Sequence, residues 1–410
     1  MVAETLTHVD GNSLAGTPIT WEMLEQDIQH RYKTTAVTGK KRSAKLMADG
    51  NGFVSFIVLV EFDWLGGTDE LPDKAVVKIT SCEKLEKLSH EISSFPQEAE
   101  VIWQNCKAAN DNELDFYQLW AHNLPAGLKI PKFYCGRHFG EDGVDAGYFA
   151  IEHFDKVESR HFYHNVQESA VLEILDQLAL VNAQSLLHPE QFAAFDNENA
   201  DHLHRMFASY EAVTKALDEA EEKNPNLLDK LHTLRTQTKY FETLETFQGR
   251  LSECCNGTKI FCHGDMWLGN MLWRKDAETQ DYYMLVIIDW QLCNMGNPME
   301  DLVRLLTAVI SGQEYQRRKT FYLSYYYDAL KKLADNVALP WTSYEDFEKK
   351  YEMVFVLISA MFQPMIMNFG PTLLKTVKDE SQLEICTENY MDKANNMLDE
   401  AVHLIKKWNL

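Results

Sequence analysis

The chain has 410 residues, of which 45% are hydrophobic and 25% are charged. This composition is ordinary for a globular protein and excludes a largely disordered chain, and the length suits two lobes or domains better than one simple core. The formal net charge of −23 at pH 7 repels phosphate backbones and anionic lipids, so nucleic acid and membrane surfaces are poor candidate partners.

Residues 1–16 lack the basic and apolar segments of a secretory signal. The longest apolar run, residues 353–369, is interrupted by Ser359, Gln363 and Pro364, which favours a buried helix over a membrane span. The eight cysteines show no Cys-x-x-Cys or Cys/His metal pattern. We therefore expect a cytoplasmic protein with reduced thiols and no membrane span.

The first part of the chain predicts a small α+β lobe. Residues 1–43 are a polar N-terminal extension with one predicted helix, Trp21–Tyr32. Residues 44–154 contain runs rich in Val, Ile and Phe that are bounded by Gly, Asp and Pro, and one helix is predicted among them over residues 95–120. The strands are predicted at residues 53–62, 75–79, 132–134 and 148–152. We expect residues 44–154 to form a nucleotide-binding N-lobe.

The second part of the chain, residues 155–410, predicts a mostly helical C-lobe. Apolar residues recur at helical spacing over residues 172–187, within residues 201–250 and from residue 300 to the end. A mixed segment at residues 259–273 and a predicted strand at 284–288 interrupt these helices. We expect this lobe to carry the catalytic loop and the helices that bind the phosphate acceptor.

The strongest chemical signal is the run Phe-Cys-His-Gly-Asp-Met-Trp-Leu-Gly-Asn at residues 261–270. An Asp followed five residues later by an Asn has the spacing of a kinase catalytic loop. Asp265 would accept the proton of the attacking hydroxyl, and Asn270 would ligate magnesium on the phosphates. Asp289 follows the predicted strand at 284–288. A carboxylate at the end of a buried strand is costly unless it binds something, and magnesium is the obvious candidate.

Each of these residues also has a purely structural interpretation. Asp265 and Asn270 could belong to a loop with Asx turns, and Asp289 could cap a strand. The combination of all three with the intervening strand favours the catalytic interpretation. Beyond Asp289, residues 297–300 predict a capping box at the start of a helix, which is a structural feature.

Two upstream features predict phosphate contacts. Gly50, Asn51 and Gly52 precede the first strand, and glycines there let backbone N–H groups approach phosphates, although Asn-Gly is also a common hairpin turn. Lys78 lies in the next strand, in the position of a strand lysine that contacts the α- and β-phosphates. A lone strand lysine is more often on the solvent face, so the order of the features supports this assignment.

A helical glutamate completes the predicted nucleotide site. Glu113 lies in the helix predicted over residues 95–120, and its proposed task is an ion pair that holds Lys78 over the phosphates. Asp115 is an alternative partner on the same helix. An exposed glutamate with no such role is the structural alternative.

These residues together resemble the ecdysteroid kinase-like (CHK kinase-like) proteins, which are relatives of choline kinase and aminoglycoside phosphotransferase. The similar segments follow the family's order over about residues 45–305, and Trp267 and Trp290 resemble its nematode branch. They are residues 49–52, 77–78, 113–117, 124–125, 261–270 and 288–291.

The resemblance implies a protein-kinase-like α+β fold with a β-rich N-lobe and a larger helical C-lobe. It implies ATP and Mg²⁺ as cofactors and transfer of the γ-phosphate to a hydroxyl of a small molecule. It also implies a hinge near residues 151–154, where Glu152, His153 and Phe154 would hold adenine. Asn182 stands where the family often has His, at a position outside the chemistry.

Three functions follow as hypotheses. The first is an active kinase for a steroid-like, lipophilic or xenobiotic alcohol, since residues 361–367 are rich in Met, which adapts to varied shapes. The second is a pseudokinase or ligand-binding module that retains the fold without turnover. The third is a choline/ethanolamine-type kinase, which needs an aromatic and acidic box. The tyrosines at residues 322–327 have helical spacing that is more typical of a core. The sequence does not identify the acceptor or the oligomeric state.

Overall fold

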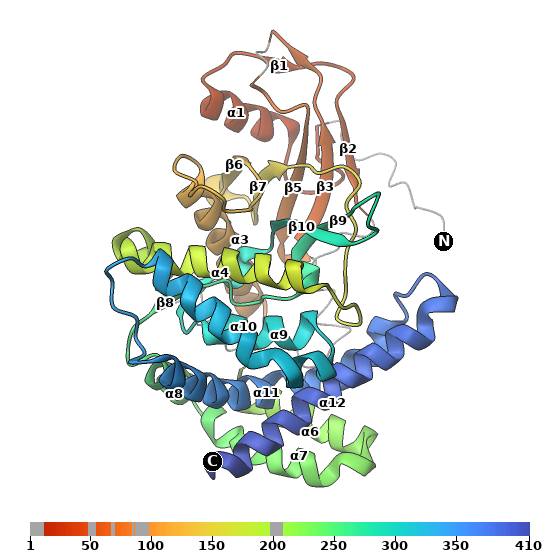
Figure 1. Ribbon diagram of the computed structural model, residues 1–410. Coiled ribbons are helices and arrows are strands. Elements are labelled where there is room, and N and C mark those ends of the chain that lie inside the picture. Colours follow the sequence, from red (N-terminus) through yellow and green to blue (C-terminus); the bar gives the residue numbers. More distant parts are fainter. Residues whose placement is uncertain (1–11, 48–54, 67–69, 84–85, 87–97, 197–207) are drawn as a thin grey trace. The chain divides into compact units, whose positions relative to one another are not determined.

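A computed structural model describes residues 12–47, 55–66, 70–83, 86, 98–196 and 208–410 (Figure 1). The contacts within the chain divide it into two compact units. Unit 1 comprises Met1–Ala126, Ile130–Lys156 and Trp290–Leu292, and unit 2 comprises Gly127–Lys129, Val157–Asp289 and Cys293–Leu410. The chain therefore passes from unit 1 into the main part of unit 2 just after the segment expected to be a hinge.

Unit 1 is built on a five-stranded sheet in which every neighbouring pair is antiparallel, in the order β2-β3-β5-β7-β6. The strands are β2 (Ser43–Leu46), β3 (Ser55–Glu61), β5 (Lys74–Ser81), β6 (Phe133–Arg137) and β7 (Ala146–Glu152). In β5, Ala75, Val77 and Ile79 are buried on one face, and Lys78 lies on the other because side chains alternate along a strand. Phe149 of β7 pairs with Lys78 and shares its face.

Helix α1 (Trp21–Tyr32) covers the sheet face opposite Lys78 (Figure 1). Its buried Leu24 and Ile28 belong to the same apolar cluster as the inward side chains of β3 and β5. The Thr20 hydroxyl caps the helix by accepting a hydrogen bond from the backbone N–H of Met23. The helix predicted over Trp21–Tyr32 is confirmed with the same bounds.

Helix α3 (Ala99–Trp120) lies on the face of the sheet that carries Lys78. The ring of its Tyr117 is 5.2 Å from that of Phe149 on β7, and both are fully buried. This packing fixes one face of α3 against the strand lysine. The remaining elements of unit 1 are β1 (Val37–Thr38), β4 (Trp64–Leu65), η1 (Glu141–Gly143) and η6 (Trp290–Leu292).

Unit 2 is mostly helical. Its helices are α4 (Glu168–Leu187), η2 (Pro189–Phe195), α6 (Tyr210–Lys223), η3 (Pro225–Leu227), α7 (Leu228–Arg235), η4 (Thr236–Phe241), α8 (Leu244–Cys254), η5 (Leu268–Asn270), α9 (Met299–Val309), α10 (Gly312–Leu333), α11 (Tyr344–Leu374), η7 (Glu380–Gln382) and α12 (Leu383–Trp408). Two short antiparallel pairs interrupt them, which are β8 (Ile260–Cys262) with β11 (Asn294–Gly296) and β9 (Met271–Lys275) with β10 (Tyr282–Ile287).

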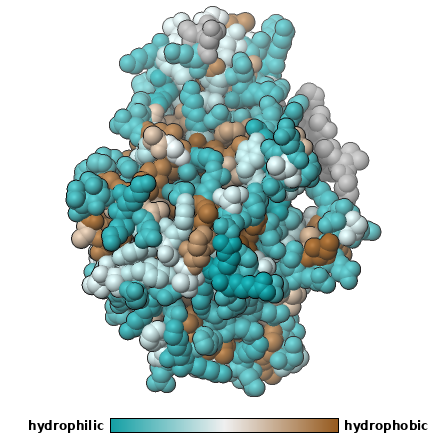
Figure 2. Space-filling view, viewed as in Figure 1, coloured by the Kyte–Doolittle hydropathy of each residue, from teal (hydrophilic) through white to brown (hydrophobic). Residues whose placement is uncertain are grey.

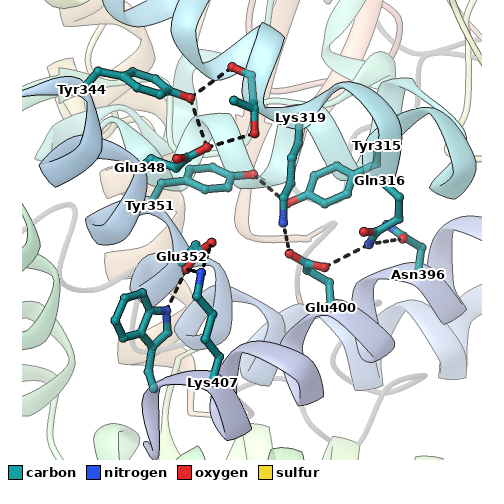
Figure 3. A network of polar contacts seen from close by, with 12 residues as sticks. Tyr315, Gln316, Lys319, Tyr344, Glu348, Tyr351, Glu352, Asn396, Glu400 and Lys407 are labelled. Carbon is teal, nitrogen blue, oxygen red and sulfur yellow. Dashed lines mark hydrogen bonds and ion pairs between the residues drawn. The ribbon is translucent and has the colours of Figure 1, made fainter.

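Polar contacts join the three long helices α10, α11 and α12 (Figure 3). Glu400 of α12 forms an ion pair with Lys319 of α10 and accepts a hydrogen bond of 2.9 Å from Gln316. Glu352 of α11 lies 2.6 Å from the ammonium of Lys407. Both carboxylates are buried, and a buried charge without its partner is strongly destabilising. These pairs therefore fix how the three helices pack within unit 2.

Among the described residues, α4 and α11 are long and apolar enough to cross a membrane by length and composition alone. In each, 61% of the apolar window is buried within the protein, a pattern that the core helices of soluble proteins share. Pro364 lies inside α11 without ending it. The buried helix expected over residues 353–369 is present as part of α11, with its first half, residues 354–361, buried.

The predicted α+β class is confirmed. The strands predicted in residues 44–154 correspond to β3, β5, β6 and β7, and the strand predicted at 284–288 corresponds to β10. The short strands β2, β8, β9 and β11 were not predicted as strands. They lie in segments that mix apolar and polar residues without a regular period.

Candidate active site

The hairpin of β9 and β10 brings Asn270 and Asp289 to the same place. Met271 at the start of β9 pairs with Ile287 at the end of β10. Next to this pair, the backbone N–H of Ile288 donates to the carbonyl of Asn270 at 2.9 Å. In an antiparallel pair, the residue before one strand and the residues after the other are neighbours. Asn270 and Asp289 therefore lie together at the open end of this hairpin.

The loop that leads to Asn270 is anchored by Asp301, at the start of α9. The two carboxylate oxygens of Asp301 accept hydrogen bonds from the backbone N–H groups of His263, at 2.7 Å, and Gly264, at 2.9 Å. Asp301 is 1% exposed, so both bonds are shielded from water. Gly264 has φ of 83°, a conformation that favours glycine. This bend and its two bonds fix the direction in which the loop leaves β8.

The ring of His263 ties the same loop to the end of β10. Its Nδ1 accepts from the backbone N–H of Asp265 at 3.2 Å, so its Nε2 carries the proton. That nitrogen then donates to the carbonyl of Ile288 at 3.0 Å. The imidazole thus links the backbone of Asp265 to the residue before Asp289.

Replacing Asp301 by Ala should lower the free energy of unfolding by about 2–5 kcal/mol, because two buried N–H groups lose their acceptor at about 1–3 kcal/mol each. Asp301→Asn keeps one acceptor oxygen and should lose less. Urea denaturation measures both variants, with Asp328→Ala at an exposed position of α10 as the control. A loss for Asp301→Ala no larger than that of the control would contradict the anchoring role.

Three groups surround the carboxylate of Asp265. The side-chain amide nitrogen of Asn270 donates to its Oδ2 at 2.9 Å and to its backbone carbonyl at 2.8 Å. Nη1 of Arg304 lies 3.5 Å from Oδ1. Burial raises the pKa of Asp265, Arg304 lowers it, and the nearby carboxylate of Asp289 raises it again. Because the nitrogen of the Asn270 amide is engaged, its oxygen is the atom left to bind a cation.

Asp289 has φ of 65°, in the left-handed region that non-glycine residues rarely adopt. Strained backbone of this kind concentrates at functional sites. The described residues contain no group of three or more His, Cys, Asp or Glu side chains that could hold a metal ion. A magnesium ion at Asn270 and Asp289 would therefore take its other oxygens from phosphates and water, as magnesium commonly does. The two residues fit such an ion, which would also relieve the repulsion between Asp265 and Asp289.

In unit 1, the ammonium of Lys78 lies 2.6 Å from Oε2 of Glu113. The two side chains are 11% and 2% exposed, so this is a buried ion pair. Asp115, the alternative partner, instead contacts the ring of His138 at 2.8 Å. The structure thus brings Glu113, and not Asp115, to the strand lysine.

The short helix η6, directly after Asp289, belongs to unit 1 and packs on α3. The ring of Trp290 stacks on Phe116 with centroids 3.8 Å apart and planes 11° apart. The amide of Asn112 donates to the carbonyl of Gln291 at 3.1 Å. The helix that carries the partner of the strand lysine therefore also holds the residues that follow Asp289.

The predicted hinge residues lie at the end of β7. The backbone N–H of Glu152 donates to the carbonyl of Lys132 at 2.9 Å, and its carboxylate accepts from the N–H of the same residue at 3.3 Å. Nδ1 of His153 lies 3.8 Å from a carboxylate oxygen of Asp155. Since the N–H of Glu152 is already used, adenine contacts through a backbone N–H would fall to His153 or Phe154.

The glycine turn predicted to approach the phosphates lies outside the described residues. Gly50, Asn51 and Gly52 precede β3, whose first described residue is Ser55. Their proposed role stays a prediction from the sequence.

Asn297 lies at the start of helix α9, as predicted. Its side-chain oxygen accepts from the N–H of Met299 at 3.0 Å, and its carbonyl accepts from the backbone N–H of Glu300 at 3.0 Å. Glu300 is 4% exposed, and burial raises its pKa to about 7. A carboxyl in the unfolded chain titrates near pH 4.3.

The raised pKa of Glu300 predicts a pH-dependent stability. Between about pH 4.3 and 7 the folded protein holds a proton that the unfolded chain releases, so Glu300 favours folding at low pH and this contribution is lost as the pH rises to 7. At pH 8, Glu300→Gln should therefore be about 3 kcal/mol more stable than the wild type, and the two should converge near pH 4. Denaturation across this range measures the difference. Glu278→Gln, at an exposed position, is the control, and a pH-independent gain for Glu300→Gln would contradict the assignment.

The family model described as "Uncharacterized oxidoreductase dhs-27" (DUF1679) matches residues 7–407. The chain belongs to the DUF1679 family. A curated relative from Caenorhabditis elegans, "Uncharacterized kinase-like protein D1044.1", is 22% identical over 273 residues, which cover 65% of this chain and 67% of that protein.

Two solved structures of small-molecule phosphotransferases are similar to this DUF1679 chain. One, from Ralstonia eutropha JMP134, is described as an aminoglycoside phosphotransferase; it is 10% identical with a TM-score of 0.45, over 88% of this chain and 93% of that one. The other is a microcompartment-associated aminopropanol kinase, 13% identical with a TM-score of 0.42, over 90% of this chain and 94% of that one. These similarities are remote, so the functional argument rests on the residues described above.

Two charged residues of this DUF1679 chain escaped the sequence prediction, Asp301 and Arg304. They lie one turn apart on α9, where both side chains are buried among the apolar face that includes Leu302 and Leu305. Opposite charges one turn apart within an apolar stretch of helix are the signal that could have revealed them, because buried charges are rarely retained without a partner.

Proposed function

We propose that the chain is an ATP- and Mg²⁺-dependent kinase that transfers the γ-phosphate to a hydroxyl of a small molecule. The observation that carries this proposal is the arrangement around Asp265, whose carboxylate lies beside the amide of Asn270 and close enough to Asp289 for the two acids to repel. Phosphoryl transfer is mostly positioning and charge stabilisation. Asp265 offers a carboxylate that can orient the acceptor hydroxyl, and Asn270 and Asp289 offer oxygen atoms that can bind a cation. This arrangement meets both requirements.

Each residue has a distinct role in this proposal. Asp265 orients the acceptor hydroxyl and accepts its proton, and Asn270 and Asp289 hold the magnesium ion. That ion supplies positive charge against the developing negative charge of the phosphates. Lys78 contacts the α- and β-phosphates, and its buried ion pair with Glu113 holds its ammonium in place.

The acceptor that the helices favour is a steroid-like, lipophilic or xenobiotic alcohol. On α11, Phe362, Met365 and Met367 are apolar side chains that stay partly exposed, which suits a site for an apolar molecule. By contrast, Tyr326 and Tyr327 of α10 are 0% and 7% exposed, so these rings belong to the core and do not form a box for choline. An apolar alcohol is therefore a better candidate acceptor than choline or ethanolamine.

An oxidoreductase function, which the description of the family names, is less well supported than a kinase function. The usual dinucleotide site needs a parallel sheet with a G-x-G-x-x-G turn before a helix. The main sheet described for unit 1 is antiparallel throughout, and the full sequence contains no G-x-G-x-x-G. A direct check is the absorbance of NADH and NADPH in the presence of the protein and candidate alcohols or ketones.

The experiment that tests the kinase proposal is untargeted. The protein is incubated with ATP, Mg²⁺ and a metabolite extract, and mass spectrometry searches for products that gain one phosphate. Asp265→Asn, in the same extract, is the matched blank. Phosphorylated products that need Asp265 support the proposal. ATP binding in a thermal-shift assay without product from any extract would instead support a pseudokinase.

A further inference from the structure

Trp267 has an unusual setting in the catalytic loop, two residues after Asp265. Its indole lies directly on the backbone of Gly269. A Cβ atom added to Gly269 would be 2.4 Å from the nearest ring carbon, and real Cβ atoms do not approach this closely. Gly269 is thus required by space rather than by its backbone angles. The close contact holds the indole in one position in the loop.

The side chain of Trp267 also lowers the pKa of the Asp265 carboxyl, which places the indole next to that carboxylate. Trp267 thus joins Asn270 and Arg304 around Asp265. A carboxylate held at several points has few orientations left, and the direction of its free lone pairs decides where a hydroxyl can bind. Trp267 is thus placed to set that direction.

The ring of Trp267 also belongs to an apolar cluster built around the buried side chains of Phe162 and Tyr390. Ile366 and Leu373 of α11 pack against the same cluster, and like Trp267 they remain partly exposed. Because these partly exposed side chains belong to one cluster rather than occurring singly, they form an apolar patch beside the catalytic loop.

The apolar patch continues along one face of α11 towards Asp265. Phe362, Ile366 and Leu373 lie at spacings of four and seven residues, which places them on one side of the helix. The guanidinium of Arg304, which contacts Asp265, lies 4.0 Å from the ring centroid of Phe362. Two large apolar side chains therefore lie close to the candidate catalytic base. Trp267 is next to Asp265 itself, and Phe362 contacts Arg304, the ion-pair partner of Asp265. The end of unit 2 where α11 and α12 meet also shows apolar side chains at its surface, at the right of Figure 2.

We propose, on the basis of the kinase function proposed above, that Trp267, held in the catalytic loop against Gly269, positions Asp265 and forms, with Ile366 and Leu373, the wall of the acceptor site. The acceptor is then an alcohol in which the hydroxyl is attached to an apolar group at least as large as one ring. Its apolar part lies against the indole and the face of α11, and its hydroxyl meets Asp265. Gly269 is part of this acceptor site because the absence of a side chain there leaves room for the indole.

The binding half of this proposal is tested with 2-naphthalenemethanol, a fluorescent apolar alcohol, and the full chain without ATP. Trp267→Ala and Gly269→Ala should each weaken binding about ten- to a hundredfold, the effect of losing a large apolar contact. Gly249→Ala in α8 is the matched control, because an added Cβ there meets nothing within 4 Å. Circular dichroism verifies that each variant is folded. The proposal is wrong if the wild type does not bind the probe or if the Trp267 and Gly269 variants bind it equally well.

The positioning half is tested by separating kcat from KM. Trp267→Phe keeps an apolar ring but is smaller and lacks the polar N–H beside Asp265, so it should retain the KM for 2-naphthalenemethanol and lower kcat about tenfold. Trp267→Ala should change both constants. Equal kcat in wild type and Trp267→Phe would overturn the positioning role. Should the wild type transfer no phosphate to any acceptor, the proposed kinase function fails, and the ATP-free binding comparison still decides whether Trp267 and Gly269 form an apolar site.

Discussion

Asp265→Asn should lower the rate of phosphate transfer by about 10²–10⁴, because the acceptor hydroxyl loses the group that orients it and takes its proton. The amide keeps the shape of the side chain, and its oxygen can still accept the 2.9 Å hydrogen bond from Asn270. The measurement is initial rate with saturating ATP and Mg²⁺, with any acceptor found in the extract experiment.

The same variant should not be less stable than the wild type. Burial raises the pKa of Asp265, and Asp289 raises it further, so the charged form is disfavoured in the folded protein. Asn removes that charge, although it also weakens the contact with Arg304. Asp281→Asn, at an exposed position in the turn between β9 and β10, removes the same charge and should leave both rate and stability unchanged.

A fall in activity that accompanies unfolding would assign Asp265 a structural role. Full activity of a folded Asp265→Asn would remove it from the mechanism altogether. The two readouts together therefore separate catalysis from stability, which a single activity assay cannot do.

The sequence predicted the elements that have a clear local pattern of apolar residues. Helix α1 was predicted with its observed bounds, and in the structure Leu24 and Ile28 lie on its buried face and Thr20 caps it. The strand that carries Lys78 was predicted from its run of apolar residues, which Pro and Asp precede in the sequence. Such patterns depend only on residues that are close together in the sequence. They were sufficient to predict the α+β class.

The contacts that hold the candidate site are long-range, and a sequence period does not show them. Glu113 and Asp115 were both acidic residues on one helix, and only the packing of α3 on the sheet decides that Glu113 meets Lys78. Asp301 could not be assigned to the catalytic loop, because its two partners lie far from it in the sequence. The sequence likewise does not show that the indole of Trp267 lies on Gly269. Each of these depends on where two separate segments meet.

The buried pair of Lys78 and Glu113 predicts a second large effect. Lys78→Met and Glu113→Leu should each lower the free energy of unfolding by about 3–5 kcal/mol, since each leaves a buried charge without its 2.6 Å partner. The double variant Lys78→Met/Glu113→Leu should recover most of this loss, because a buried ion pair can often be replaced by apolar residues at little cost. Urea denaturation of the four proteins measures the cycle.

Activity should behave differently from stability in the same four proteins. All three variants lose the ammonium or its orientation at the phosphates, so each should transfer phosphate about 10²–10³ times more slowly than the wild type, and the double variant should not recover. The exposed pair of Lys74 and Glu61 joins the same strand to its neighbour at 3.1 Å and is the matched control, in which Lys74→Met should change neither activity nor stability appreciably. A double variant that regained both stability and activity would show that the pair only supports the fold. Recovery of stability without activity is the outcome that a phosphate-binding lysine requires, because apolar side chains can replace the packing of the pair but cannot replace its charge.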